Sequence, residues 1–495
     1  MFDNFITSGS MMMSNFYAKL KKNSMKNEDF IIKQIQNFES SPKRKDMITG
    51  DRYYRGFHDV LNKKITIIDA DGKEVPLKHM PNNKIIDNQY RKMVKQKVNY
   101  LVGKPFVIET DNEKYSNILK NQIFNKDFMR MFKVLIKDTL NQGISWIYPY
   151  YNERGEFILK PIKNYYLYPL WGDAEHTYLD AGIRFYEYIT YEGSNEKKVT
   201  KVEVFDTKGI WYFTYDNKLI PDNVPFRPYF SINEKNYKWN KIPIIPFKYN
   251  DDEIPLIRHV KSLQDSLNMV RSIFGDSMEQ TPLNTITVLV NYEGEALDTF
   301  KSNLMTTGII PVRSIDGVAG DVKTLEIKVD AENYNTFLKV TKEAIIENGM
   351  SYNAKDDRLS GTPNEMNIRS MYNDIDLDAT DMEAEIQAGL EQLLWFINCH
   401  LYNTGQGDFF NEEVNFTFNR DILMNNSETI QNIKNSEGLI SRRTQLSHHP
   451  YVTNIEEELK RIKEEEEEDK RNNDIYNNVF PTPNNPNEDL DNEEQ

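Results

Sequence analysis

The sequence predicts a protein of the α+β class, because helical and strand-like patterns occupy different stretches of the chain. Residues 143–239 carry short runs of alternating apolar and polar residues separated by turn residues, as in an antiparallel sheet. Residues 255–274 and 364–401 instead repeat apolar residues at steps of three and four, as in helices with one apolar face. The length of 495 residues allows more than one domain.

The composition excludes several classes of protein. No apolar run reaches membrane-spanning length and residues 1–20 lack a signal-like stretch, so we expect no membrane partner and synthesis into the cytoplasm. The net charge of -15 argues against tight binding of DNA phosphates, although not against a wall past which DNA slides. The single cysteine, Cys399, excludes an internal disulfide and is interpreted as a packing residue.

The first 254 residues are predicted to form helices followed by the sheet. Residues 1–40, with a possible helix at 30–38, receive no function, and residues 41–64 form an aromatic-rich packing helix. Residues 85–102 form a helix that Gly103 ends. Its basic residues are interpreted as a solvated face, with a nucleic-acid patch as the alternative: Arg91, Lys92, Lys95 and Lys97.

The sheet region is unusually rich in aromatic residues. Its strands are predicted at 144–152, 157–162, 186–193, 198–206 and 209–217. A buried sheet face or a subunit interface is favoured over base stacking for its aromatic side chains: Tyr148, Tyr150, Tyr151, Tyr165, Tyr166, Tyr168 and Trp171.

The stretch from Pro255 to Leu401 organises the rest of the chain. It opens with a helix whose apolar seam requires a partner helix, formed by Leu256, Val260, Leu263, Leu267, Val270 and Phe274. Strands are predicted at 285–292, 308–312 and 322–329. A second helix at 332–348 then carries one face of Tyr334, Leu338, Thr341 and Ile345.

A polar loop at 353–361 leads into the longest periodic segment. Thr362, Pro363 and Glu365 are typical of a helix start, and the spacing continues to Leu401, roughly 60 Å of helix. Four carboxylates on one of its faces are interpreted as solvated, or else as a stripe that repels a polyanion or pairs with a neighbouring subunit: Asp374, Asp378, Asp381 and Glu385. A strand at 414–418, a helical unit at 427–470 and a disordered tail follow.

The sequence carries no strong catalytic or metal-binding motif. No P-loop, H-E-x-x-H or G-x-S-x-G motif is present, and the seven histidines lack metal-ligand spacing. We therefore predict no catalytic residue, no metal and no cofactor. The acidic pairs Asp251–Asp252 and Asp356–Asp357 leave a magnesium-dependent nuclease as the alternative.

Six strings, in order from about Arg44 to Lys470, carry a resemblance to a known family. They are DRYYRGFHDVL from Asp51, NNKIIDNQYRKMVKQKVNYLVGKPF from Asn82, GISWIYPYYNERGEF from Gly143, IPIIPFKYNDDE from Ile242, VKSLQDSLNMVRSIFGDSME from Val260 and GLISRRTQL from Gly438. The sequence resembles the portal proteins of tailed bacteriophages, in the branch typical of long-tailed, non-contractile phages. This resemblance implies a ring, commonly a dodecamer, at one capsid vertex of the virion, assembled in the bacterial cytoplasm. The alternatives are a packaging enzyme that uses Asp356 and Asp357 with magnesium, and a capsid-associated structural protein that forms no channel.

The resemblance also implies an architecture, partners and site residues. After the N-terminal segment 1–40, the parts would be a β-rich wing at 41–254, a stem helix at 255–280, an α/β clip at 281–330, a second stem helix at 331–350, a tunnel loop at 351–363, a long kinked wing helix at 364–403, a wing strand at 404–426, a helical crown at 427–470 and the acidic tail 471–495. The expected partners are double-stranded DNA, the terminase large subunit, the head-to-tail adaptor, and the major capsid and scaffolding proteins. DNA would pass Asn353, Lys355, Asp356, Asp357, Arg358 and Arg369. Subunits would meet through the stem residues Leu256, Val260, Leu263, Leu267, Val270, Phe274, Tyr334, Leu338 and Ile345.

Overall fold

The chain forms two compact units that combine helices and sheets. The computed structural model describes residues 27–68, 72–76, 81–177, 179–216, 218–232, 235–280, 285–290, 296, 299, 314–315, 318–319, 321–326, 330–353, 365–420, 426–452 and 454–479. The first unit comprises residues 1–353 and 373–421, and the second comprises residues 354–372 and 422–495. The helices and sheets confirm the predicted α+β class.

Helices open the first unit. They are α2 (Asn27–Ser40), α3 (Pro42–Tyr54), α4 (Gln89–Val102), α5 (Glu113–Ile118) and α6 (Lys126–Gln142). The Ser41 side chain accepts a hydrogen bond from the Arg44 N–H, and Pro42 stands at the first helical position of α3. The helix ends ten residues earlier than predicted, because the chain turns at Gly56 with φ of 93° before the short helix η1 (Asp59–Asn62).

The predicted single sheet is wrong, because its strands divide into two separate sheets. A five-stranded antiparallel sheet has the order β10-β9-β8-β7-β6. Its strands are β6 (Leu167–Trp171), β7 (Leu179–Glu192), β8 (Asn195–Phe205), β9 (Gly209–Asp216) and β10 (Lys218–Pro228). A three-stranded sheet has the order β13-β4-β5 and consists of β4 (Ile144–Tyr151), β5 (Phe157–Ile162) and β13 (Ile245–Lys248).

Helix α2 completes the core of the five-stranded sheet. Its apolar side chains Phe30, Ile31, Ile35 and Phe38 pack in one cluster with residues of the sheet such as Ile183, Val202 and Phe213. The Phe38 ring meets the Phe185 ring edge-on, with centroids 6.0 Å apart. Helix α2 is therefore part of the hydrophobic core of this sheet.

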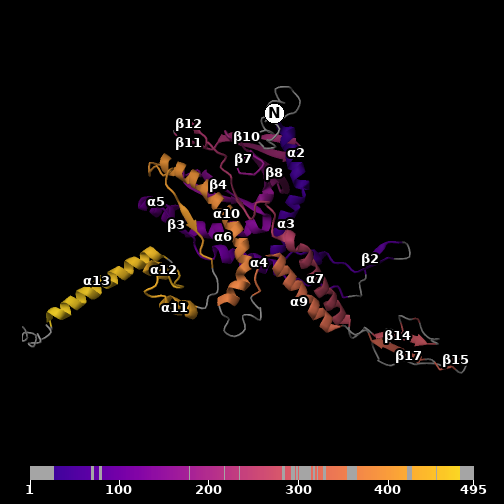
Figure 1. Cartoon of the computed structure of the whole chain (residues 1–495). Coiled ribbons are helices and arrows are strands. Elements are labelled where there is room, and N and C mark those ends of the chain that lie inside the picture. Colours follow the sequence, from indigo (N-terminus) through magenta and orange to yellow (C-terminus); the bar gives the residue numbers. More distant parts are fainter. Residues whose placement is uncertain are drawn as a thin grey trace, which may run out of the picture. The chain divides into compact units, whose positions relative to one another are not determined.

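The helical hairpin that follows the sheets confirms the predicted helix-strand-helix order. Helices α7 (Ile257–Gln280) and α9 (Ala331–Asn348) lie side by side (Figure 1). Between them in the chain, β14 (Thr285–Val290) pairs with β17 (Asp321–Glu326). The strand predicted at 308–312 lies outside the described residues.

A helix of 39 residues, α10 (Glu365–Asn403), follows, and it begins and ends close to the predicted positions. At Gly389 it touches β13, where an added Cβ would stand 2.8 Å from the Pro246 carbonyl oxygen. The chain enters the first unit again at Asn373, within α10, and β18 (Asn415–Thr417) then pairs with β3 (Val107–Glu109).

The second unit contains the C-terminal helices α11 (Asn426–Asn435), α12 (Arg442–Ser447) and α13 (Ile455–Val479). Ion pairs join α12 to α13, with Arg443 2.6 Å from Glu456 and Arg442 bonded to Glu466. The tail predicted to be disordered from residue 471 is thus helical up to Val479, because the charged helix continues without a breaker. Residues 480–495 lie outside the described part.

Candidate functional site

The α7–α9 hairpin is the element on which the sequence placed subunit contacts. Its most apolar side chains are buried within the chain itself, with Leu256, Val260, Leu267 and Ile345 at most 1% exposed. Across the pair, the rings of Phe274 and Tyr334 stack with centroids 3.6 Å apart. These four residues are therefore not available to a neighbouring subunit, and the expected subunit contact is wrong for them. Other helices of the same chain, α3, α4 and α9, pack on α7.

The remaining seam residues lie at the border of this packing. Leu263, Val270, Phe274, Tyr334 and Leu338 are all half-buried. The apolar side chains that point fully outwards are different ones, and sequence reasoning did not select them: Met269, Ile273 and Met278 on α7, and Phe337 and Val340 on α9.

A ladder of polar side chains on α7 binds the extended segment before α4. We call residues 82–88 the strap. Four α7 residues spaced four apart accept hydrogen bonds from backbone N–H groups of the strap and of the α4 start, each between 2.6 and 3.1 Å: Gln264 from Tyr90, Asn268 from Asp87, Ser272 from Ile85 and Asp276 from Asn83. Because all four side chains are buried, they replace the water that the strap backbone would otherwise require.

Ion pairs reinforce the strap at both helices of the hairpin. The Asp87 carboxylate lies 3.0 Å from Arg271 of α7 and 2.9 Å from Lys342 of α9. Burial opposes ionisation of Asp87, but the hydrogen bonds from Lys342 and Gln89 outweigh it and lower the pKa of this carboxyl group. The strap is therefore fastened to α7 and α9 together.

The predicted solvated face of α4 is wrong for Lys97, whereas Arg91 and Lys95 are exposed as predicted. Lys97 is 3% exposed, and its ammonium group lies 2.6 Å from the Asp378 carboxylate of α10. Burial lowers the pKa of Lys97, and the nearby Asp378 charge opposes that change. The carboxylates of the predicted acidic face of α10 do not share one environment. Asp378, the partner of Lys97, is buried, while Asp374 and Asp381 are exposed.

A second buried charge lies just before α7. The Glu253 side chain is almost fully buried and bonds with Lys43, while its Oε1 lies 2.8 Å from His176 Nδ1 and 3.6 Å from Lys248 Nζ. Burial alone would raise its pKa, but the hydrogen bond with His176 and the charge of Lys43 lower the pKa of Glu253 to about 2. This carboxylate joins α3, β13 and the β6–β7 loop at the entry to α7.

Only two of the six predicted channel residues are among the described residues. Asn353 is half-buried and is the last residue of the first segment of the first unit, and Arg369 is exposed on α10. Lys355, Asp356, Asp357 and Arg358 lie outside the described residues.

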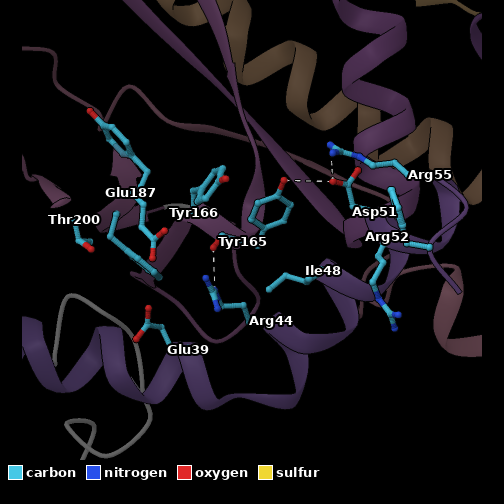
Figure 2. A pocket seen from close by; sticks show the side chains of 13 residues that line it. Glu39, Arg44, Ile48, Asp51, Arg52, Arg55, Tyr165, Tyr166, Glu187 and Thr200 are labelled. Carbon is cyan, nitrogen blue, oxygen red and sulfur yellow. Dashed lines mark hydrogen bonds and ion pairs between the residues drawn. The ribbon is translucent and has the colours of Figure 1, made fainter. Parts of the chain in front are cut away.

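A groove of about 630 Å³ lies between α3 and β7 (Figure 2). Its three arginines are engaged within the chain: Arg44 donates to the Tyr165 carbonyl oxygen at 3.1 Å, Arg52 lies 2.5 Å from Asp59, and Arg55 lies 3.0 Å from Asp51. Since these guanidinium groups already have partners, the groove is not a prepared anion site.

Within the described residues, no group of three or more histidine, cysteine, aspartate or glutamate side chains is arranged to hold a metal ion. The acidic pair Asp251–Asp252 lies exposed in a turn. Among the described helices, none is long and apolar enough to cross a membrane.

Comparison with known proteins decides the family. Residues 39–472 match the phage portal proteins of the SPP1 Gp6-like type. The chain belongs to the phage portal protein family. The portal protein of Bacillus phage SPP1 is 27% identical over 446 residues, which cover 87% of this chain and 86% of the relative. The portal protein of Clostridium phage phiCD119 is 24% identical over 454 residues, which cover 88% and 96%.

Membership in the portal family confirms the resemblance found in the sequence and the function as a capsid portal for DNA packaging. The protein is accordingly a virion component, and the family is structural rather than enzymatic. The match begins at residue 39, so α2 (Asn27–Ser40) lies almost entirely before it.

Proposed function

We propose that copies of this portal protein form a closed ring, most simply a dodecamer, whose axial channel carries double-stranded DNA into the capsid and later out of it. The observation that carries the ring is the exposed apolar surface of the α7–α9 hairpin. Ile273 is 50% exposed on α7 and Val340 is 57% exposed on α9. Clusters of this kind on a structural element of a soluble chain indicate an interface.

A head-to-tail ring requires two different surfaces on every subunit, since each copy contacts one neighbour with each surface. The hairpin offers one apolar surface on each helix: Met269, Ile273 and Met278 on α7, and Phe337 and Val340 on α9. In this proposal the outward residues join neighbouring subunits, and the buried seam holds each hairpin together.

The order of helices and strands along the chain supports an assignment of its segments to the parts of a portal subunit. The sheets and helices of residues 41–254 form the wing together with α10 and β18, α7 and α9 form the stem, and residues 281–330 form the clip. Residues 351–363 form the tunnel loop, and α11 to α13 form the crown. The clip contacts the terminase large subunit during packaging and the head-to-tail adaptor afterwards, while the wing contacts the major capsid and scaffolding proteins.

Assembly is tested by placing a charge on each apolar surface. Ile273→Glu and Val340→Glu should each convert rings to monomers, because a contact that buries an aliphatic side chain contributes about 1.5–3 kcal/mol and a buried carboxylate opposes it further. Mass by light scattering and ring images by electron microscopy are the measurements. Ser262→Glu and Asn335→Glu, at exposed polar positions of the same helices, serve as matched controls. Intact rings in both apolar-site variants would contradict the proposed interface.

The channel is tested separately at the tunnel loop. Charge reversal at Lys355 or Arg358 should change the length of DNA packaged while leaving ring assembly intact, because DNA passes these side chains only after the ring has formed. Unchanged packaged DNA in both variants would contradict the assignment of these residues to the channel.

A further inference from the structure

Two neighbouring side chains of α4 hold the chain where it leaves stem helix α9. Lys97 Nζ donates to the Met350 carbonyl oxygen at 2.9 Å. Gln96 donates to the Tyr352 carbonyl oxygen at 3.1 Å and accepts from the Ser351 hydroxyl group at 2.9 Å. Three consecutive residues after α9 are thus fixed to one turn of another helix.

The backbone at this point is in an unusual conformation. Met350 has φ of 45°, a left-handed value that residues with a Cβ seldom adopt. The end of α9 explains this value, because the Met350 N–H donates to the Glu347 carbonyl oxygen and the Ser351 N–H donates to the Ile346 carbonyl oxygen, a pattern that closes helices with a left-handed residue. Lys97 and Gln96 bind the carbonyl oxygens of Met350 and Tyr352, and so attach this helix end to α4.

The same lysine connects this point to the long helix. Its ammonium group pairs with Asp378 of α10, and the other carboxylate oxygen of Asp378 accepts from the hydroxyl group of Tyr249, the residue after β13, at 2.5 Å. A lysine that served only to complete an ion pair would need no contact with the α9 terminus. Here one buried charge has partners on both elements.

We propose that Lys97 is a positioning residue, which locks the exit of stem helix α9, at residues 350–352, to helix α10. We call the contacts of Lys97 with Met350 and Asp378 the lock, and they exist whether or not the protein forms a channel. A role of the lock in DNA passage rests on the proposed function, in which residues beyond 353 line the channel.

Hydrogen exchange of the assembled ring tests the lock directly. Removing Lys97 alone leaves a buried, unpaired carboxylate that can unfold the chain, so the main variant is Lys97→Met with Asp378→Asn, in which the amide oxygen of the introduced side chain still accepts from Tyr249. We expect the backbone amides of residues 349–352 to exchange at least tenfold faster, while the amides of α6 are unchanged. Gln96→Ala introduces no unpaired charge and should give a smaller acceleration at Ser351 and Tyr352.

The chain offers a matched control in its other buried lysine–aspartate pair, Lys63 with Asp276 at the strap. Lys63→Met with Asp276→Asn should leave residues 349–352 protected. Unchanged exchange of these residues in the Lys97 variant, or equal acceleration in the Lys63 variant, would overturn the proposal. Packaged DNA length, measured on the same rings, reports on the channel role alone, so failure of that role would not be mistaken for failure of the lock.

Discussion

Replacing Glu253 by glutamine should destabilise the protein at neutral pH by about 3 kcal/mol. The value follows from the pKa of this group, which falls from 4.5 to about 2 on folding, since each unit of pKa corresponds to about 1.4 kcal/mol. The glutamine has the same shape but no charge, and it leaves Lys43, His176 and Lys248 facing one another without a carboxylate between them.

The loss should depend on pH with a defined sign. Because the pKa of Glu253 is lowered by folding, its stabilisation is complete above the unfolded-state value of 4.5 and disappears as the pH falls through the folded-state value of about 2. The difference in the free energy of unfolding between the wild type and Glu253→Gln should therefore be full at pH 7 and shrink between about pH 5 and pH 2.

Urea denaturation at several pH values, at equal protein concentration, measures this difference. Tryptophan fluorescence, to which all five tryptophans contribute, follows the unfolding. Glu175→Gln, an exposed neighbour, is the control and should have little effect at any pH. A difference that stays the same at pH 3 as at pH 7 would refute the reasoning, since the loss would then come from packing and not from charge.

Three further predictions concern packing, the strap and the cysteine. Gly389→Ala should lower the free energy of unfolding by about 1–3 kcal/mol, because the new Cβ would press on the Pro246 carbonyl oxygen and this outweighs the better helix propensity of alanine. Chemical denaturation measures the change, and a stabilised variant would contradict the prediction. Asn268→Ala should cost about 2 kcal/mol, because it leaves the Asp87 N–H and one of the two N–H groups of the buried Gln264 amide without an acceptor. The exposed Asn335→Ala is the control, and equal stability of the two variants would argue against the ladder. Burial raises the pKa of Cys399 to about 11, so only a small fraction of this thiol is the reactive thiolate at pH 8. Cys399 should therefore react with a thiol reagent about a hundredfold more slowly than free cysteine at this pH, and an equal rate would contradict the prediction.

The elements best predicted from the sequence are those whose apolar spacing is uninterrupted. Helices α9 and α10 and the strand pair β4–β5 lie close to their predicted ranges. The strands β10 and β13 were missed because they contain prolines. Both are edge strands, in the orders β10-β9 and β13-β4, where a residue without an N–H costs no hydrogen bond on the open side.

The burial of two charged side chains, Lys97 and Asp378, is also not predicted by the sequence analysis. Lys97 was assigned to solvent from its charge, although its position continues the apolar series of Tyr90, Val94 and Leu101 at steps of four, three and four. Asp378 likewise falls between Ile375 and Met382 in the apolar series of α10. Spacing thus contained the signal for both, but a single sequence cannot reveal that the two charges meet, because they lie on helices 281 positions apart.

The strap ladder has a mechanical consequence for the stem. Its four hydrogen bonds follow one another along α7, at Gln264, Asn268, Ser272 and Asp276. A force along the axis of α7 loads all four in shear, so they must rupture together. A force perpendicular to that axis would instead peel the strap away one bond at a time. The attachment of the strap to α7 therefore resists a force along the helix axis better than a force that pulls the strap away from the helix.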